Sequence, residues 1–423
     1  MEIDKLLASE RLSVAKFSFE KTFKAYATNR QQVIAKLDAE SLKKKAREIK
    51  ERSIASIESL KKKAVESLVA NGIKVFEAKD AEEARNIALE IIPEGELVVK
   101  SKSNVINEIE LLKSLEGRNE VIETDCGDFI VRLCEEQSTH PVTPALHIPI
   151  ERIVDKIEEK FGVKLEQNPE KIIEWVRNYL REKISVAKVG LTGANFISSD
   201  GSLIILENEG NVSLVSRIPN RHVVITGIDR IVETVEDAMT LCRVAAIWGT
   251  GASLPTYVNI ISSPSKTADI QKNIVYGAQG AKEVYLILVD NGRSKAVADG
   301  LGEILYCINC GACLYFCPIY RQVFDSYGLH YFGGIGVSKL AFINDLKTAY
   351  NRGLYYCTTC QACKVECPVG IDIPKVIKSL REHAVKNGIE TEANKKMIGN
   401  VRVCGNPFGT VEEGKIPKEL YCC

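Results

Sequence analysis

The chain has 423 residues, of which 45% are hydrophobic and 26% charged, and its 56 Lys and Arg balance 56 Asp and Glu. These values are typical of an ordinary globular protein with two or three domains. No stretch of about eighteen uninterrupted apolar residues occurs, so a transmembrane helix is not expected. The charged start, residues 1–5, has no apolar signal region, and we expect a cytoplasmic protein.

Residues 1–70 are predicted to form a helical arm. Ala, Leu, Lys and Glu dominate the segment, Pro is absent, and apolar residues recur at three- and four-residue steps. The lysine triplets 43–45 and 61–63 are open to a nucleic-acid interpretation. A solvated helix face or a docking surface fits better, because acidic residues are interleaved and no aromatic stacking platform accompanies them. We therefore expect no nucleic-acid partner.

Residues 71–295 alternate between short β-rich runs and helical stretches. Strands that alternate with helices predict an α/β domain with a largely parallel sheet. The expected strands are 73–76, 97–99, 121–123, 202–206, 222–226, 257–261 and 283–289, and the expected helices are 81–91, 104–115, 149–161, 170–181 and 235–248.

Residues 296–423 contain two cysteine runs with the same spacing, which account for eight of the chain's fourteen cysteines. Each run reads Cys-x2-Cys-x2-Cys-x3-Cys-Pro, and the eight are Cys307, Cys310, Cys313, Cys317, Cys357, Cys360, Cys363 and Cys367. This is the bacterial-ferredoxin pattern for a pair of [4Fe–4S] clusters. Structural zinc usually uses two separated cysteine pairs, and a disulfide framework belongs to short secreted chains. The pattern therefore predicts one-electron transfer through two clusters.

The ferredoxin pattern also predicts which cysteines share a cluster, because the fourth cysteine of each run ligates the other cluster. The first cluster would take Cys307, Cys310, Cys313 and Cys367. The second would take Cys357, Cys360, Cys363 and Cys317. The gap of about forty residues between the runs is too long for a compact bacterial ferredoxin and contains a helical stretch, 337–350, so we expect an all-α module.

Short motifs in a fixed order make the chain resemble the lactate utilization protein B family. Each motif is weak alone, and the two cysteine runs follow them in the family's order. The matching segments are KSKS at 100–103, ETD at 123–125, HPVTPALH at 140–147, TGAN at 192–195, NEGN at 208–211, TGI at 226–228 and DNGRS at 290–294.

The resemblance implies a lactate-utilization domain related to the sugar-phosphate isomerase and CoA-transferase fold, joined to the cluster module. It further implies an electron-transfer subunit of a complex that oxidises L-lactate, or a related 2-hydroxy acid, to pyruvate. The implied partners are a cysteine-rich subunit and a second subunit with a lactate-utilization domain. The tail 405–409 resembles the segment after the second cluster in heterodisulfide-reductase-type subunits, so we hypothesise a separate cysteine-rich partner, and Cys404, Cys422 and Cys423 could contribute to its metal site.

Polar turn segments in the α/β domain are candidates for a small-ligand pocket. Turn chemistry alone accounts for Gly, Asn and Asp in such segments. The functional interpretation places them at strand ends around a cavity, with Glu209 as the candidate base or polar anchor. Lys102 could bind a carboxylate or phosphate, and a surface lysine is an equal alternative. The candidate pocket residues are Lys102, Thr192, Asn195, Asn208, Glu209 and Asn211.

Three functions are compatible with these patterns. The first is the electron-transfer subunit described above. The second is an electron-transfer subunit of a heterodisulfide-reductase-like complex with another substrate. The third is a self-sufficient enzyme whose α/β domain turns over a small acid. Nothing in the sequence resembles a flavin or nicotinamide site, so we expect substrate chemistry on a partner or in the α/β pocket.

Overall fold

A computed structural model describes residues 10–416. Its centre is a six-stranded sheet in the order β1-β12-β7-β4-β2-β3, in which every neighbouring pair is parallel. This confirms the α/β prediction. The strands are β1 (Lys74–Ala78), β2 (Val98–Lys100), β3 (Val121–Glu123), β4 (Val189–Thr192), β7 (Arg221–Gly227) and β12 (Glu283–Val289).

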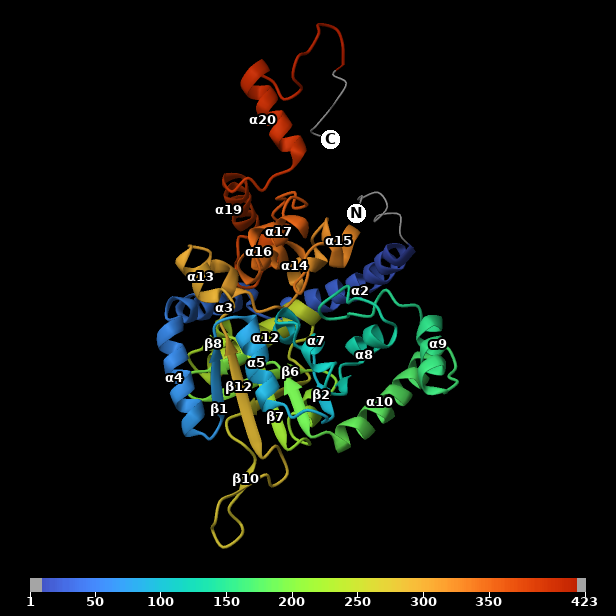
Figure 1. Cartoon of the computed structure of the whole chain (residues 1–423), viewed down its shortest axis with the longest axis vertical. Helices are drawn as coiled ribbons and strands as arrows, with labels where there is room; N and C mark the ends of the chain where they lie inside the picture. The colour runs from blue at the N-terminus through green and yellow to red at the C-terminus, as the bar shows by residue number, and fades with distance from the viewer. Residues whose placement is uncertain (1–9, 417–423) are drawn as a thin grey trace.

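A second, smaller sheet lies beside the first, in the order β8-β5-β6-β9. Its strands are β5 (Phe196–Ser198), β6 (Ser202–Glu207), β8 (Ile231–Val232) and β9 (Tyr257–Ile261). A two-stranded hairpin of β10 (Lys266–Thr267) and β11 (Val275–Tyr276) projects at the bottom of Figure 1.

Helices cover the sheets. The expected helices 81–91, 149–161 and 235–248 lie within two residues of their observed bounds, whereas the one expected over 170–181 extends to Val186, and the helices Cys126–Leu133 and Asn211–Val215 were not expected. The stretch 104–115 forms two short helices because the backbone at Glu110 turns left-handed, with φ of 51°. The helices of this region are α5 (Ala81–Ile91), α6 (Asn104–Glu108), α7 (Leu111–Leu115), α8 (Cys126–Leu133), α9 (Ile150–Phe161), α10 (Pro169–Val186), α11 (Asn211–Val215) and α12 (Val235–Thr250), with a single 3-10 turn, η1 (Ile228–Arg230).

The N-terminal segment is helical, as expected, and consists of α2 (Glu10–Ile34), α3 (Ala39–Ala55) and α4 (Ile57–Ala70). Asp38 begins α3, where its carboxylate accepts a hydrogen bond from the backbone N–H of Ser41 at 3.0 Å. In Figure 1, α4 lies along the edge of the α/β domain, whereas α2 runs between that domain and the C-terminal module.

In the part of the chain that the structure describes, the C-terminal module consists of helices and connecting loops. It has no strand, apart from one isolated bridge between Gly328 and Phe332. The expected helix 337–350 is two helices, because Asp345 starts a new one by accepting a hydrogen bond from Thr348 N–H at 2.7 Å. The elements are α13 (Arg293–Ala298), η2 (Gly302–Tyr306), α14 (Ala312–Tyr315), α15 (Tyr320–Val323), η3 (Phe324–Ser326), α16 (Gly333–Ile343), α17 (Leu346–Asn351), α18 (Ala362–Glu366), α19 (Ile373–Lys386) and α20 (Glu392–Cys404). Helix α20 extends away from the rest of the molecule (Figure 1).

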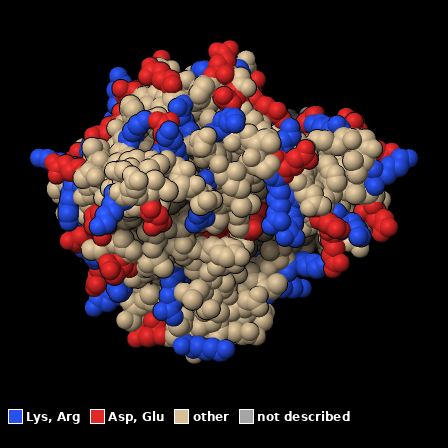
Figure 2. Space-filling model, turned by 90° about the horizontal axis from the view of Figure 1, so that it is seen from below, with Lys and Arg blue, Asp and Glu red and all other residues tan. Residues whose placement is uncertain are grey.

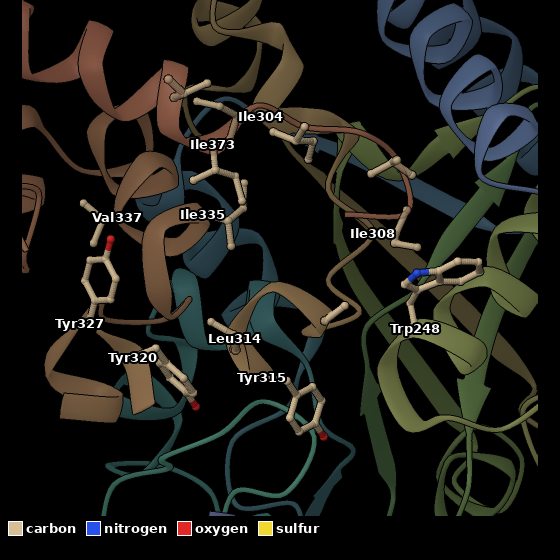
Figure 3. Packing of buried hydrophobic residues seen from close by; sticks show 14 of the residues in the cluster. Trp248, Ile304, Ile308, Leu314, Tyr315, Tyr320, Tyr327, Ile335, Val337 and Ile373 are labelled. Carbon is tan, nitrogen blue, oxygen red and sulfur yellow. The ribbon is translucent and has the colours of Figure 1, made fainter. Parts of the chain in front are cut away.

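The module shares one apolar core with the arm and with α12. Trp248 of α12 packs in the same cluster as Ile308 and Tyr315 of the first cysteine run (Figure 3). Phe19 of α2 belongs to it too, and Tyr26 of α2 stacks on Tyr315 with ring centroids 4.0 Å apart. Because these side chains are buried together, the module is packed onto the α/β domain as one continuous interior.

The carboxyl ends of the central strands face this module. In a parallel sheet these ends lie on one edge, where loops from several strands meet. The segments that follow β2, β3, β4, β7 and β12 carry Lys102, Asp125, Asn195, Arg230 and Arg293. The module therefore caps the edge at which α/β domains bind ligands.

Viewed from the opposite end, the surface shows acidic and basic side chains interspersed around a mostly uncharged centre (Figure 2).

Candidate iron–sulfur site and adjoining cavity

The two cysteine runs adopt the same local backbone. The second and fourth residues after the first cysteine are left-handed in both: Asn309 (φ 56°) and Gly311 (φ 79°) in one, Thr359 (φ 55°) and Gln361 (φ 69°) in the other. In both loops the backbone N–H of the second residue lies 3.4 Å from the first cysteine's sulfur. Such turns aim backbone N–H groups at sulfur, which stabilises a thiolate.

The fourth cysteine of each run lies among the first three of the other. Burial raises the pKa of the Cys310 thiol, and the neighbouring Cys367 and Cys307 raise it further. Cys313 has a raised pKa for the same reasons, with Cys367 again among its neighbours. The structure thus brings Cys367, from the end of the second run, against the thiols of the first.

The reciprocal arrangement holds for the second run. Burial raises the pKa of Cys363 to about 12, with further contributions from Cys317, Cys357 and Cys360. The first set of thiols borders a cavity of about 330 Å³. Its lining includes Cys307, Cys310, Cys313 and Cys367. A smaller cavity of about 20 Å³ is bordered by Cys313, Cys317, Cys357, Cys360 and Cys363.

These donor groups suit a cluster better than a single ion. Among residues 10–416, no three or more His, Cys, Asp or Glu side chains converge as one metal ion would require. A mononuclear zinc site needs four ligands around one point. In a [4Fe–4S] cluster each thiolate binds a different iron, so the sulfurs stand apart around a space.

The surroundings of the two loops differ. In the first, Ile308 and Ala312 are buried, whereas in the second Thr358, Cys360 and Gln361 are exposed. Each loop receives one arginine, which the sequence analysis did not single out. Arg230 donates to the carbonyl oxygen of Cys307 at 3.0 Å, and Arg381 donates to that of Cys357 at 2.6 Å.

A second cavity, of about 310 Å³, lies between the α/β domain and the first cysteine loop. The loop contributes Ile308, Asn309 and Cys310 to its wall. Thr192 is not among the lining residues, because its hydroxyl is buried and hydrogen-bonded to Nε2 of His222 at 2.8 Å. The other candidate pocket residues all line it: Lys102, Asn195, Asn208, Glu209 and Asn211.

The three asparagines of this cavity also have structural partners. Asn195 accepts a hydrogen bond from Leu206 N–H at 2.9 Å, and Asn208 accepts one from the hydroxyl of Thr256 at 3.2 Å. Asn211 donates to the hydroxyl of Thr124 at 3.1 Å. Turn chemistry and a cavity wall are therefore compatible at the same positions.

Acidic groups surround Lys102. Its ammonium lies 3.2 Å from Asp125 and 4.0 Å from Asp128. Burial lowers the pKa of Lys102, but Asp128 and Asp125 outweigh burial and the net pKa is raised. Burial raises the pKa of Asp128 to about 7, against the attraction of Lys102. Asp128 can therefore hold a proton at a higher pH than an exposed aspartate.

Glu209 is part of the same polar group. Its carboxylate accepts a hydrogen bond from the backbone N–H of Cys126 at 3.0 Å. Burial and the nearby Asp125 raise its pKa, while the Cys126 hydrogen bond and Lys102 lower it, and the net direction is upward. Glu209 can therefore hold a proton at a higher pH than an exposed glutamate.

The other cysteines of the described residues, Cys126, Cys134, Cys242 and Cys404, line neither of the two cavities that the cysteine runs border. Burial, and then Glu209, raise the pKa of Cys126 to about 12, so its thiol is not activated. Cys404, at the end of α20, is exposed. Cys422 and Cys423 lie outside the described residues.

A lactate-utilization fold joined to an iron–sulfur module is the class of protein that these features define. The family model described as LUD domain matches residues 61–289, and the one described as 4Fe-4S dicluster domain matches residues 303–371. The chain is 34% identical over 345 residues to lactate utilization protein B of Bacillus pumilus, covering 80% of this chain and 71% of the relative. It belongs to the lactate utilization protein B family.

Two further comparisons extend this result. Lactate utilization protein B of a Geobacillus strain is 32% identical, covering 83% of this chain and 73% of the relative. The uncharacterized electron transport protein YkgF of Escherichia coli is 31% identical, covering 88% and 77%. Among solved structures, a DUF162 family protein from Deinococcus radiodurans matches 55% of this chain and 98% of its own at 14% identity, with a TM-score of 0.30.

In residues 10–416 no helix is long and apolar enough to cross a membrane.

Proposed function

We propose that this chain is the iron–sulfur electron-transfer subunit of a cytoplasmic complex that oxidises L-lactate, or a related 2-hydroxy acid, to pyruvate. Two [4Fe–4S] clusters would relay electrons one at a time to or from a cysteine-rich partner subunit. One cluster would be held by Cys307, Cys310, Cys313 and Cys367, and the other by Cys357, Cys360, Cys363 and Cys317.

The observation that carries the proposal is that the fourth cysteine of each run lies near the thiols of the other run. Cys367 adds to the electrostatic environment of Cys310 and Cys313, and Cys317 does the same for Cys363. Two clusters that exchange ligands in this way are close neighbours, which suits electron transfer between them. The names of the relatives, lactate utilization protein B and electron transport protein, support the hydroxy-acid context.

The second cluster would exchange electrons with the partner, because its loop reaches the surface. Cys360 and Gln361 are exposed, and so is the apolar Val365 of the following helix α18. Helix α20, further along the chain, has no buried residue along its length. Both features suit a docking face for the cysteine-rich subunit.

Anaerobic purification with iron and sulfide analysis tests the clusters, and two clusters predict about eight irons per chain. Cys367→Ser tests the exchanged ligand: it should abolish the same electron paramagnetic resonance (EPR) signal as Cys307→Ser and spare the signal lost in Cys357→Ser. Four irons or fewer in freshly reconstituted unsubstituted protein would contradict the two-cluster assignment.

The identity of the complex is tested by co-purification from native extract. A cysteine-rich subunit together with a second lactate-utilization-domain subunit would support the lactate-oxidising complex. Recovery of a cysteine-rich subunit with no lactate-dependent reduction of the clusters would favour the alternative, a heterodisulfide-reductase-like complex with another substrate.

A second candidate function is binding of a small acid in the α/β cavity. The cavity favours it because Lys102 and Glu209 lie on one wall and the first cluster loop forms another. Lys102→Met should weaken binding of lactate or pyruvate in calorimetric titration of the cluster-loaded protein. Reduction of an artificial acceptor by L-lactate with the isolated chain would make this chain an enzyme by itself, and no turnover with intact clusters would remove that possibility.

A further inference from the structure

Three buried cations surround the first cysteine loop. They are Lys50 of α3, Arg230 of η1 and Lys339 of α16, and none is more than 4% exposed. They come from three elements far apart in the sequence. Charged side chains are rarely buried so completely unless an anion balances them.

Two of these cations contact the loop itself. The Nη1 atom of Arg230 donates to the carbonyl oxygen of Cys307 at 3.0 Å. The Lys339 ammonium donates to Oδ1 of Asn309 at 2.8 Å and lies 4.2 Å from the ring centre of Tyr331. Because the Asn309 backbone N–H lies 3.4 Å from the sulfur of Cys307, both positive charges act close to that ligand.

The third cation has no carboxylate partner of its own among residues 10–416. The Lys50 ammonium donates to the backbone carbonyl of Asp229 at 2.6 Å. The Asp229 carboxylate is already shared by two arginines: Nε of Arg230 lies 3.2 Å from one oxygen, and Nε of Arg293 lies 2.6 Å from the other.

The local charges do not cancel. Arg293 also forms a bidentate pair with Glu108, with both N···O distances at 2.8 Å. The network contains four basic side chains, Lys50, Arg230, Lys339 and Arg293, and two carboxylates, Glu108 and Asp229, so the excess is two positive charges when both lysines are protonated. Burial lowers the pKa of both lysines, that of Lys50 to about 7, so a nearby anion is needed to keep them charged. Among the described residues, the Nη2 atom of Arg230 is buried and has no hydrogen-bond partner. An unbalanced buried charge is costly, so this arrangement calls for a further anion.

We propose that Lys50, Arg230 and Lys339 balance the negative charge of the cluster bound by Cys307 and raise its reduction potential. This inference rests on the proposed function, since it requires the cluster. A cluster held by four thiolates is an anion, and reduction adds another negative charge. Burial by itself disfavours that added charge, whereas cations in a water-poor surrounding stabilise the reduced cluster.

In the part of the chain that the structure describes, the second cysteine loop has no comparable set of buried cations around it. Arg381 donates to the Cys357 carbonyl, and it is only partly buried beside an exposed loop. Water and salt screen charges there, so a single positive charge has less influence on the reduction potential of the second cluster. The cations therefore act mainly on the cluster that adjoins the α/β cavity, and they make it an electron acceptor in spite of its burial.

The test is an anaerobic redox titration followed by EPR, on cluster-loaded protein with Lys339→Met. The midpoint potential of one cluster should become more negative, while that of the other stays unchanged. Lys364→Met is a matched control, because Lys364 follows the ligand Cys363 directly but pairs with Asp372 at the surface. Lys364→Met should shift the potential of either cluster less than Lys339→Met shifts that of the cluster bound by Cys307. Lys339→Arg keeps the positive charge and should therefore keep the potential of the unsubstituted protein.

Lys50→Met provides a second variant from another helix, with the same expected negative shift. It serves also if Lys339→Met fails to retain iron. Unchanged potentials in both methionine variants, with iron near the unsubstituted level, would overturn the inference and leave the clusters intact. By contrast, a low iron content in the unsubstituted protein would overturn the proposed function itself. The two failures are therefore distinguishable.

Discussion

The two cysteine loops have the same local structure and different surroundings. Both have left-handed residues at the same two positions, and both receive an arginine at the carbonyl of the first cysteine. The first loop is packed against the α/β domain among buried cations, whereas the second has exposed residues such as Cys360. Sequence spacing therefore sets the local backbone of the two loops, while the tertiary surroundings decide how each proposed cluster would behave.

The comparison predicts unequal consequences when a ligand is removed. Cys313→Ser and Cys363→Ser should each lower the iron content from about eight to about four per chain. The unfolding temperature should fall further for Cys313→Ser, because helix α14 around Cys313 packs in the apolar core shared with α2 and α12. Iron analysis and circular dichroism melting measure both effects. Equal melting temperatures would show that the shared core does not depend on the first cluster.

Access by small molecules should separate the loops next. A water-soluble iron chelator, added to reduced protein under anaerobic conditions, should remove about half of the iron quickly and the rest slowly. The fast phase should correspond to the exposed second loop. Cys360→Ser, which removes that cluster in advance, should leave only the slow phase, whereas a single-phase release from unsubstituted protein would argue against a difference in exposure.

A smaller difference is expected for the two arginines. Arg230→Met and Arg381→Met should each make the potential of the adjacent cluster more negative, because each loses one positive charge near the first cysteine. The shift should be larger for Arg230, which is buried, than for Arg381, which is partly exposed. Redox titration at low and high salt checks the order, and only the Arg381 effect should weaken appreciably with salt.

Asp128, which lines the cavity beside the first loop, should contribute least to the difference between the two loops, and its effect is on the stability of the fold. Burial raises its pKa in the folded protein to about 7, above the value of 3.8 that applies when it is exposed. Protonated Asp128 therefore stabilises the fold fully below about pH 4, and this contribution is lost as pH rises toward 7. Asp128→Asn should gain on the order of 4 kcal/mol relative to the unsubstituted protein between pH 4 and pH 8.

Denaturant unfolding at both pH values measures this difference. Glu166→Gln, an exposed acid in the loop before α10, is a suitable control and should show no such pH dependence. A constant difference between Asp128→Asn and the unsubstituted protein would mean that Asp128 stays ionised. In that case it would offset part of the positive charge near the first loop.

Much of the fold could be predicted from hydrophobic patterning, and the exceptions have physical causes. Strands 257–261 and 283–289 were predicted at their observed bounds. Strand β4 was missed because it contains Gly190, which weakens a strand pattern. A Cβ atom at Gly190 would lie 1.9 Å from the carbonyl oxygen of Val215, so close packing of α11 on the strand requires glycine there. The helix break at Asp345 had a visible signal, a capping aspartate.

The candidate site divides in the same way. The cysteine spacing is local, so the sequence was sufficient to predict the thiol groups. Lys50, Arg230 and Lys339 are separated by more than a hundred residues from one another, and no pattern connects them. Lys50 lies in the predicted helical arm, where nothing in the sequence marks it as a buried residue. Only the folded chain places it beneath the first loop, since α3 packs against the elements that carry Asp229 and Cys307.

Helix α2 has a mechanical consequence. Arg30 of this helix pairs with Glu366 of the cysteine module at 2.5 Å, and Tyr26 donates to the carbonyl oxygen of Trp248 in the α/β domain at 2.7 Å. A large apolar interface bridged by one continuous helix acts as a strut and opposes hinge motion between domains. The cavity between the α/β domain and the first cysteine loop is thereby held at constant width. Electron passage across it would need no swinging domain, so its rate should depend little on solvent viscosity.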